Sequence, residues 1–238
     1  TTDELKFIVD GNVILNSNLI GNITSGGNDL GTVTILGDAS GKAQSITGNI
    51  GSSASSDIKV LNIGESGVST NYSTTTINGN VFANSTVLNN GATNSSELIL
   101  ASGKNITSTI TTADANMGIL TLAGGIQTVT GQVGASGASL KEINAGVAGS
   151  TSTFNSNVYA SNLNMTGTGT VILNSDLTGN VVATGNNQGI LTTTGLNKTI
   201  TGNIGSSTSL DLNTLNIGSD TVLGNYSITT INGNVFAN

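Results

Sequence analysis

Carboxylates and amines are the main ionisable side chains that this sequence offers for chemistry. The 238 residues include 13 acidic residues and six lysines, but no histidine, cysteine or arginine. The chain therefore lacks the commonest general base, the thiol nucleophile and the usual zinc ligands, and a Ser-His-Asp triad is excluded. The acids are dispersed, and the closest grouping, Asp3, Glu4 and Asp10, forms a polar lead-in at the start of the chain. The sequence predicts no catalytic, metal or cofactor site, and we expect a non-enzymatic protein.

Three aromatic residues stand at equivalent places and are the candidates for partner binding. Phe82, Tyr159 and Phe236 occur in NVFA, NVYA and NVFA, at intervals of 77 residues. Two interpretations stay open. If strand alternation continues past the preceding valine, the rings point outward and line up along the molecule, where they could grip a partner. If the chain bends there, Phe82 and Phe236 turn inward and fill the core.

Turn chemistry explains the other residues that could bind a ligand. GGNDLG at 26–31 is similar to calcium-binding nonapeptide repeats. Its Asp29 has no acidic counterpart in VATGNNQG at 182–189, so we interpret the stretch as a turn. Asparagine tolerates left-handed backbone and can form hydrogen-bonded ladders between stacked strands. The alternative, a glycan or ligand site on asparagine, depends on sequon matches such as Asn22 and Asn105.

Long internal repeats set the organisation of the chain. INGNVFAN occurs at 77–84 and again at 231–238, and ITGNIGSS occurs at 46–53 and 200–207, with the same offset of 154 residues. A degenerate copy, FNSNVYAS at 154–161, lies halfway. We therefore predict one domain built from three units of about 77 residues, and we expect the natural protein to continue beyond them. The predicted units are 5–84, 85–161 and 162–238.

A shorter word recurs within the units and predicts the secondary structure. It reads apolar, polar, Gly or Ser, polar, apolar. Its nine copies stand at 19–23, 46–50, 77–81, 106–110, 129–133, 154–158, 177–181, 200–204 and 231–235. In a strand, its first, third and fifth residues share an apolar face, and the other two share a neutral polar face. Such a strand cannot bury its apolar face alone, but stacked copies build a continuous core. Because helical patterning is missing, the sequence predicts an all-β parallel β-helix, a solenoid of about nine rungs.

Charge and hydropathy limit the partners. The formal net charge is −7, and the six lysines are scattered singly, so no basic patch is available for nucleic acid. No stretch reaches the roughly 18 apolar residues that span a bilayer, so we expect no membrane span in this sequence. The start, TTDELKF, has neither an initiator methionine nor the apolar core of a signal peptide.

The repeated GNI and GNV words, the richness in Gly, Asn and Thr, the absence of Cys and the units of about 77 residues together resemble a known family. The chain is similar to the passenger regions of bacterial autotransporters, in particular the rickettsial outer-membrane and surface cell antigens. The resemblance covers nearly the whole chain. It implies a right-handed parallel β-helix at the bacterial cell surface or outside the cell, acting in adhesion or surface coating. The partner it implies is a host-cell surface protein or glycan, and it supplies no catalytic residues.

Three functions stay open. The first is the cell-surface passenger or stalk just described. The second is a self-assembling structural fibre or surface-layer subunit, because a β-helix end exposes unpaired strand edges and an apolar cross-section. For the same reason we expect the chain to associate end to end. The third is a polysaccharide-acting or ice-binding solenoid, suggested by TTT at 74–76 and 192–194, although ice binding needs regular rows of threonine.

Overall fold

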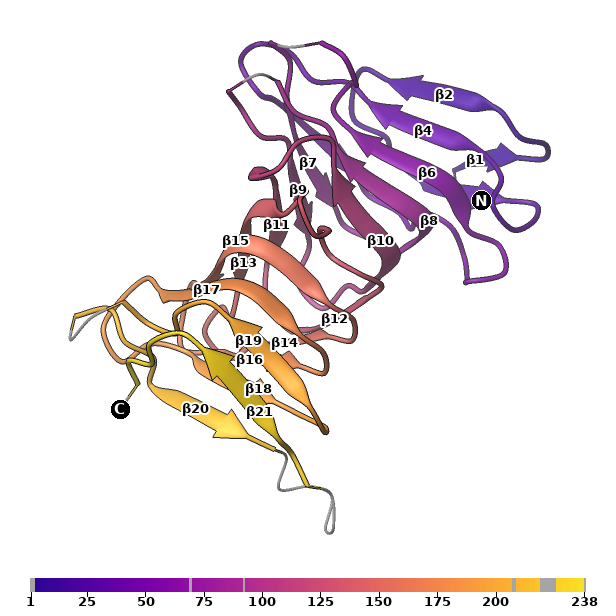
Figure 1. Cartoon of the computed structure of the whole chain (residues 1–238). Helices are drawn as coiled ribbons and strands as arrows, with labels where there is room; N and C mark the ends of the chain where they lie inside the picture. Colours follow the sequence, from indigo (N-terminus) through magenta and orange to yellow (C-terminus); the bar gives the residue numbers. More distant parts are fainter. Residues whose placement is uncertain (1–2, 69, 92, 207–208, 219–225, 238) are drawn as a thin grey trace.

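The chain forms a β-solenoid of about nine turns (Figure 1). The computed structural model describes residues 3–68, 70–91, 93–206, 209–218 and 226–237, and within them it contains strands and turns but no helix. The turns follow one another from the N-terminal end (indigo) to the C-terminal end (yellow). At about 4.8 Å per turn, nine turns are about 43 Å long. The predicted all-β fold and its number of rungs are confirmed.

The strands form three parallel sheets. A short sheet pairs β1 (Glu4–Phe7) with β3 (Asn22–Ser25). The ten-stranded sheet contains, in order, β2 (Asn12–Leu15), β4 (Thr32–Ile35), β6 (Ile58–Ile63), β8 (Val81–Leu88), β10 (Ile106–Thr112), β12 (Ile126–Thr130), β14 (Thr151–Phe154), β16 (Thr170–Leu173), β18 (Ile190–Thr193) and β20 (Thr214–Ile217). The nine-stranded sheet contains, in order, β5 (Lys42–Ile46), β7 (Ser73–Ile77), β9 (Glu97–Leu100), β11 (Met117–Leu122), β13 (Leu140–Ala145), β15 (Val158–Met165), β17 (Leu177–Ala183), β19 (Lys198–Thr201) and β21 (Thr229–Asn232).

Alternating side chains build the core inside the turns. In β11, Gly118, Leu120 and Leu122 are buried, while the residues between them point outward and are partly exposed. Each inward residue stacks on its counterpart in the next turn, so columns of inward side chains run along the molecule. The column that continues from Ile23 is at most 1% exposed at each of these positions: Ile23, Ile50, Val81, Ile106, Val129 and Phe154. Burial of one such side chain contributes about 1.5–3 kcal/mol.

The nine words do not form one stack but three stacks of three. Every unit of about 77 residues keeps its own words together, so each stack belongs to one unit. The first stack aligns Leu19, Ile46 and Ile77; the second aligns Ile106, Val129 and Phe154; the third aligns Leu177, Ile200 and Ile231.

Successive stacks are rotated about the axis of the solenoid. Val81 ends a word of the first stack and pairs with Ile106, which begins a word of the second. In the same way Val158, which ends a word of the second stack, pairs with Leu177, which begins the third. Val181 ends a word of the third stack. Pairing from turn to turn leads from Val181 back to Gln44, which lies two residues before Ile46, the start of a word in the first stack. The three stacks therefore complete one circuit, and a unit makes three turns and about a third of another.

Asparagine side chains link the turns at the words. Oδ1 of Asn22, Asn49 and Asn80 each accepts a hydrogen bond at 2.8 Å from the backbone N–H of the residue one turn later. In the third stack, Asn180 and Asn203 accept the same bond at 3.0 and 2.9 Å. The predicted asparagine ladders are confirmed. At these words the acceptor pairs with a backbone N–H, and elsewhere the side-chain amides pair directly, since Asn164 Nδ2 donates to Asn144 Oδ1 at 2.9 Å and Asn174 Nδ2 donates to Asn155 Oδ1 at 2.8 Å.

Candidate functional site

Strand alternation continues past the word, so Phe82 and Tyr159 lie on the outside of the solenoid. Phe82 is half-buried in β8, between Val81 and Ala83, which are 0% and 3% exposed. Tyr159 is half-buried in β15, between two residues that are each 1% exposed. The interpretation in which the chain bends and turns Phe82 into the core is therefore wrong.

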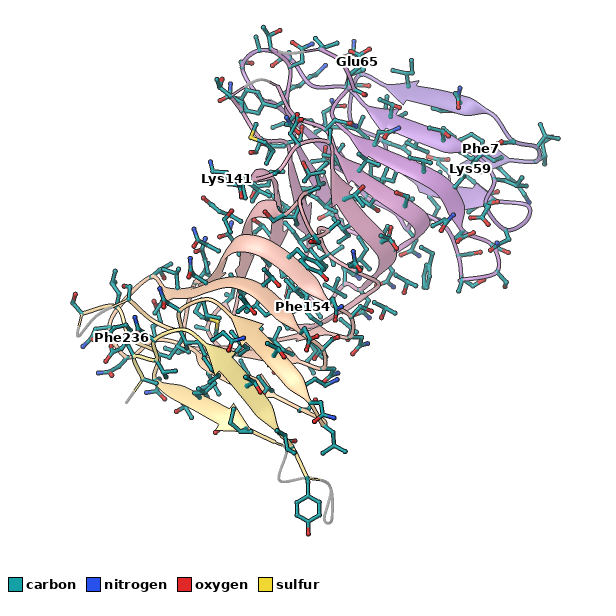
Figure 2. All side chains as sticks on the ribbon, in the orientation of Figure 1. Phe7, Lys59, Glu65, Lys141, Phe154 and Phe236 are labelled. Atoms are coloured by element: carbon teal, nitrogen blue, oxygen red, sulfur yellow. The ribbon has the colours of Figure 1, made fainter. Side chains whose placement is uncertain are left out.

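Phe236 occupies the equivalent place in the last described turn. It is 36% exposed, and the preceding Val235 is 46% exposed, whereas Val81 in the identical word is 0% exposed. The difference arises because a further turn covers Val81, at Ile106. Figure 2 places Phe236 at the C-terminal end of the molecule and the buried Phe154 among the stacked turns.

Each of these aromatic residues adjoins the base of an outward loop on the preceding turn. The N–H of Phe82 donates to the carbonyl of Ile50 at 2.7 Å, and Ile58 pairs with Ala83. Phe82 and Ala83 are consecutive in their turn. Their neighbours in the preceding turn are Gly51 and Ile58, so the chain leaves that turn after Gly51 as a loop and returns to it at Ile58. The same arrangement occurs twice more, with N–H donation at 2.7 Å from Tyr159 to Val133 and from Phe236 to Ile204, and with return of the loops at Leu140 and Leu212.

A glycine in the left-handed region is required at the base of each loop. Gly51 has a φ of 69°, and a Cβ on it would lie 2.2 Å from the carbonyl oxygen of Phe82. The two counterparts have φ values of 68° and 71°, and a Cβ would lie 2.1 and 2.4 Å from the aromatic carbonyl oxygen; they are Gly134 beside Tyr159 and Gly205 beside Phe236. One local design therefore recurs in all three units.

The three aromatic residues do not line up along the molecule. Phe82 pairs with Thr107 in the next turn, whereas Tyr159 pairs with Thr178 in a different column. Phe236 lies beside Gly205 in a third column. The expected aromatic stripe is wrong, because the extra third of a turn in each unit moves the equivalent residue to another side of the solenoid.

An open depression of about 240 Å³ lies beside Phe82. Its lining includes Asp57 from the outward loop, Asn84 from β8, and Thr107 and Thr130 from the next two turns. The strand register explains the space, because β8 has one residue more than β10 between the pairs on either side of Asn84. The same register shift follows Tyr159, where β15 pairs with β17.

A second open depression, of about 320 Å³, lies beside Phe236. Asn180, Asn203 and Asn234 of the third word stack line it, together with Val182. Amide and aromatic groups therefore adjoin here as they do beside Phe82. The two depressions lie on different flanks of their aromatic residues, since Asn84, Thr107 and Thr130 follow Phe82 in the chain, whereas Asn180, Asn203 and Asn234 precede Phe236.

Asp57 is held by a turn. Its Oδ1 accepts the N–H of Asp29 at 2.8 Å, and Asp29 has a left-handed φ of 54°. Asp211 repeats this contact with Asn187, at 3.0 Å and with a φ of 52°. The interpretation of GGNDLG as a turn is thus confirmed. Among the described residues no group of acidic side chains is arranged to hold a metal ion.

The acidic lead-in of the chain does not line the depressions beside Phe82 and Phe236. Asp10 forms an ion pair with Lys59 at 2.6 Å, near the N-terminal end of the molecule (Figure 2). The hydrogen bond from Lys59 lowers the pKa of Asp10, and the same bond raises the pKa of Lys59. Glu4 accepts a hydrogen bond from the hydroxyl of Thr24 on the next turn.

Sequence reasoning missed Asp57 as a neighbour of Phe82. The two residues are 25 positions apart, and only the pairing of Ile58 with Ala83 brings them together. A signal was present, since GSSASSDI and GSSTSLDL place Asp57 and Asp211 at the offset of the long repeat.

Comparison of the chain with protein-family models, with curated proteins and with solved structures finds no match. A search of the described residues for a helix that could cross a membrane finds none. The functional interpretation therefore rests on the geometry of the solenoid and its patches.

Proposed function

We propose that this chain is the β-helical passenger or stalk of a bacterial surface protein, without enzymatic activity, and that it acts in adhesion or surface coating. The observation that carries the proposal is the outer surface, where every unit places an aromatic residue beside the base of an outward loop, and hydroxyl or amide side chains adjoin Phe82 and Phe236. The scaffold beneath is held by parallel pairing between successive turns, which makes it a suitable spacer. The proposed location is the bacterial cell surface or the extracellular space, and the proposed partner is a host-cell surface protein or glycan.

Attachment of protein-coated beads to cultured epithelial cells tests adhesion. Beads that carry the 238-residue chain should attach. A triple variant with Phe82→Ala, Tyr159→Ala and Phe236→Ala should attach no better than uncoated beads. Ile126→Ala is the matched control, because Ile126 is 77% exposed and does not line either aromatic depression. Failure of the parent to attach would contradict adhesion, and full attachment by the triple variant would contradict a role for the patches.

A self-assembling fibre or surface-layer subunit is the second candidate function. Its support is the exposed cross-section at the C-terminal end, where Ile217 is 47% exposed and Val235 is 46% exposed. β2 and β20 are the two edges of the same parallel sheet, so β2 of a second copy would extend the sheet beyond β20 in the same direction. We propose that this polypeptide stacks end to end through these edges.

Sedimentation velocity over a range of concentrations separates the two candidates. End-to-end stacking predicts a mean mass that rises with concentration. Val235→Lys should keep the chain monomeric, because it places a charge in the exposed cross-section, whereas Ile126→Lys on the side should leave association unchanged. A monomer at every concentration would exclude the fibre and leave the stalk.

A further inference from the structure

The rotation of the units places equivalent patches on different sides of the solenoid. From Phe82 to Tyr159 the chain advances three turns and about a third of another, which is about 16 Å along the axis. Phe236 is displaced from Tyr159 by the same step. Successive aromatic residues and their surroundings therefore face different directions around the axis of the solenoid.

This arrangement limits how the patches can be used. A flat or globular partner that approaches from one side contacts one patch, because the next one faces away by about a third of a turn. A standard protein interface also buries about 800 Å² on each partner around an apolar centre. A single half-buried ring among hydroxyl and amide groups does not supply such a centre. Each patch must therefore hold its ligand by itself, and the ligand must be small and polar.

The chemistry of the Phe82 patch narrows the class of ligand. The ring offers an apolar face. Asp57, Asn84 and Thr107 add a carboxylate, an amide and a hydroxyl group within the same depression. No lysine lines it, so a phosphate or sulfate group would meet the carboxylate without a compensating cation. At about 240 Å³ it lies below the usual range of about 300–1,000 Å³ for pockets that enclose drug-sized ligands.

A neutral sugar ring fits these requirements. One face of a pyranose carries C–H groups that can pack on an aromatic ring, and its edge carries hydroxyl groups that can donate to a carboxylate and accept from an amide. In the depression beside Phe82, the carboxylate of Asp57 and the amide of Asn84 are the groups that can take these two roles.

We propose that the surfaces around Phe82, Tyr159 and Phe236 are three separate carbohydrate subsites, each of which binds one neutral sugar ring. The inference rests on the proposed adhesive function and identifies its partner as a neutral glycan. The subsites differ in one respect. Asp57 lines the depression beside Phe82, whereas the depression beside Phe236 is lined by amides without a carboxylate, and the place beside Tyr159 is taken by a serine, Ser139, whose hydroxyl donates to Asn116. We expect the Phe82 subsite to bind most strongly, because it has the carboxylate acceptor.

Amide chemical shifts of the isotope-labelled 238-residue chain test the proposal. The probes are methyl β-glucoside, methyl β-galactoside and methyl β-N-acetylglucosaminide, with glycerol at the same concentration as the control polyol. At least one glycoside should shift three separate sets of amides, around Gly51 and Phe82, around Gly134 and Tyr159, and around Gly205 and Phe236. Glycerol should shift none of them.

Single variants then test whether the subsites are independent. Phe82→Ala should abolish the first set of shifts and leave the other two unchanged, and Phe82→Tyr should restore the first set. Loss of all three sets in Phe82→Ala, with an unchanged spectrum elsewhere, would overturn independence. The absence of shifts with every glycoside would overturn the choice of ligand, and adhesive function would still stand if bead attachment required the aromatic residues. Shifts without bead attachment would instead contradict the proposed function alone.

Discussion

The two copies of INGNVFAN allow one substitution to be compared in a covered and an uncovered turn. Ile77 is 0% exposed and pairs with Ile46 on one side and Leu100 on the other. Ile231 pairs with Ile200 and remains partly exposed. In a core, Ile→Ala costs about 2–5 kcal/mol, and the cost increases with the cavity that remains. We expect about 3–5 kcal/mol for Ile77→Ala, because rungs on both sides hold the cavity open, and about 1–2 kcal/mol for Ile231→Ala.

Urea unfolding followed by circular dichroism measures both variants. Similar slopes for the two variants would justify comparing their midpoints as stabilities. The expected result is a midpoint that falls at least twice as far for Ile77→Ala as for Ile231→Ala. Equal losses would refute the reasoning, because they would mean that both residues are covered to the same extent. A loss below about 1 kcal/mol for Ile77→Ala would refute its assignment to the core.

Three further predictions concern the ladder, the loops and the N-terminal ion pair. Asn80→Ala should cost about 0.5–1.5 kcal/mol in urea unfolding, while Asn80→Asp, which keeps the acceptor oxygen, should cost less; equal losses would exclude the ladder bond as the cause. Gly51→Ala should lower the melting temperature more than Gly67→Ala, since both glycines have positive φ but a Cβ meets a carbonyl oxygen at 2.2 Å only at Gly51; the reverse order would contradict the close approach. The Asp10–Lys59 pair, with the pKa of Asp10 lowered and that of Lys59 raised, should stabilise the fold between about pH 4 and pH 10. Its contribution should be lost as the pH falls through the lowered pKa of Asp10 or rises through the raised pKa of Lys59. Asp10→Asn should therefore lower stability slightly at pH 7 in low salt and not at pH 2, and an equal effect at both pH values would contradict it.

The fold could be predicted from the sequence because its signals are local. The alternation of apolar and polar residues in each word determines which side chains face inward, and repetition of the word implies stacking. Leu19, Ile46 and Ile77 align as the repeat predicts. The same local rule, continued one residue past Val81, assigns Phe82 to the outside.

The arrangement of the candidate site could not be predicted in the same way. Whether Phe82 and Tyr159 face one side depends on the number of turns in 77 residues, which is set by the length of every connection between them. A difference of a few residues per turn accumulates over three turns into a third of a circuit, and the sequence does not indicate where each connection rejoins its turn. The proximity of Asp57 to Phe82 is hidden for the same reason, since it depends on the return of the loop at Ile58.

The rotation also explains the form of the word. At each junction the last residue of one word lies on the first residue of a word in the next unit, as Val81 lies on Ile106 and Val158 on Leu177. The first and fifth positions must therefore fit over each other as well as over their own copies, and in all nine words they are Ile, Leu, Val or Phe. The second and fourth positions face outward, and there Thr and Asn predominate. A repeat that advances by whole turns would require each position to match only itself. The interchangeable ends of this word are the feature expected of a repeat that moves to a new corner of the solenoid with every unit.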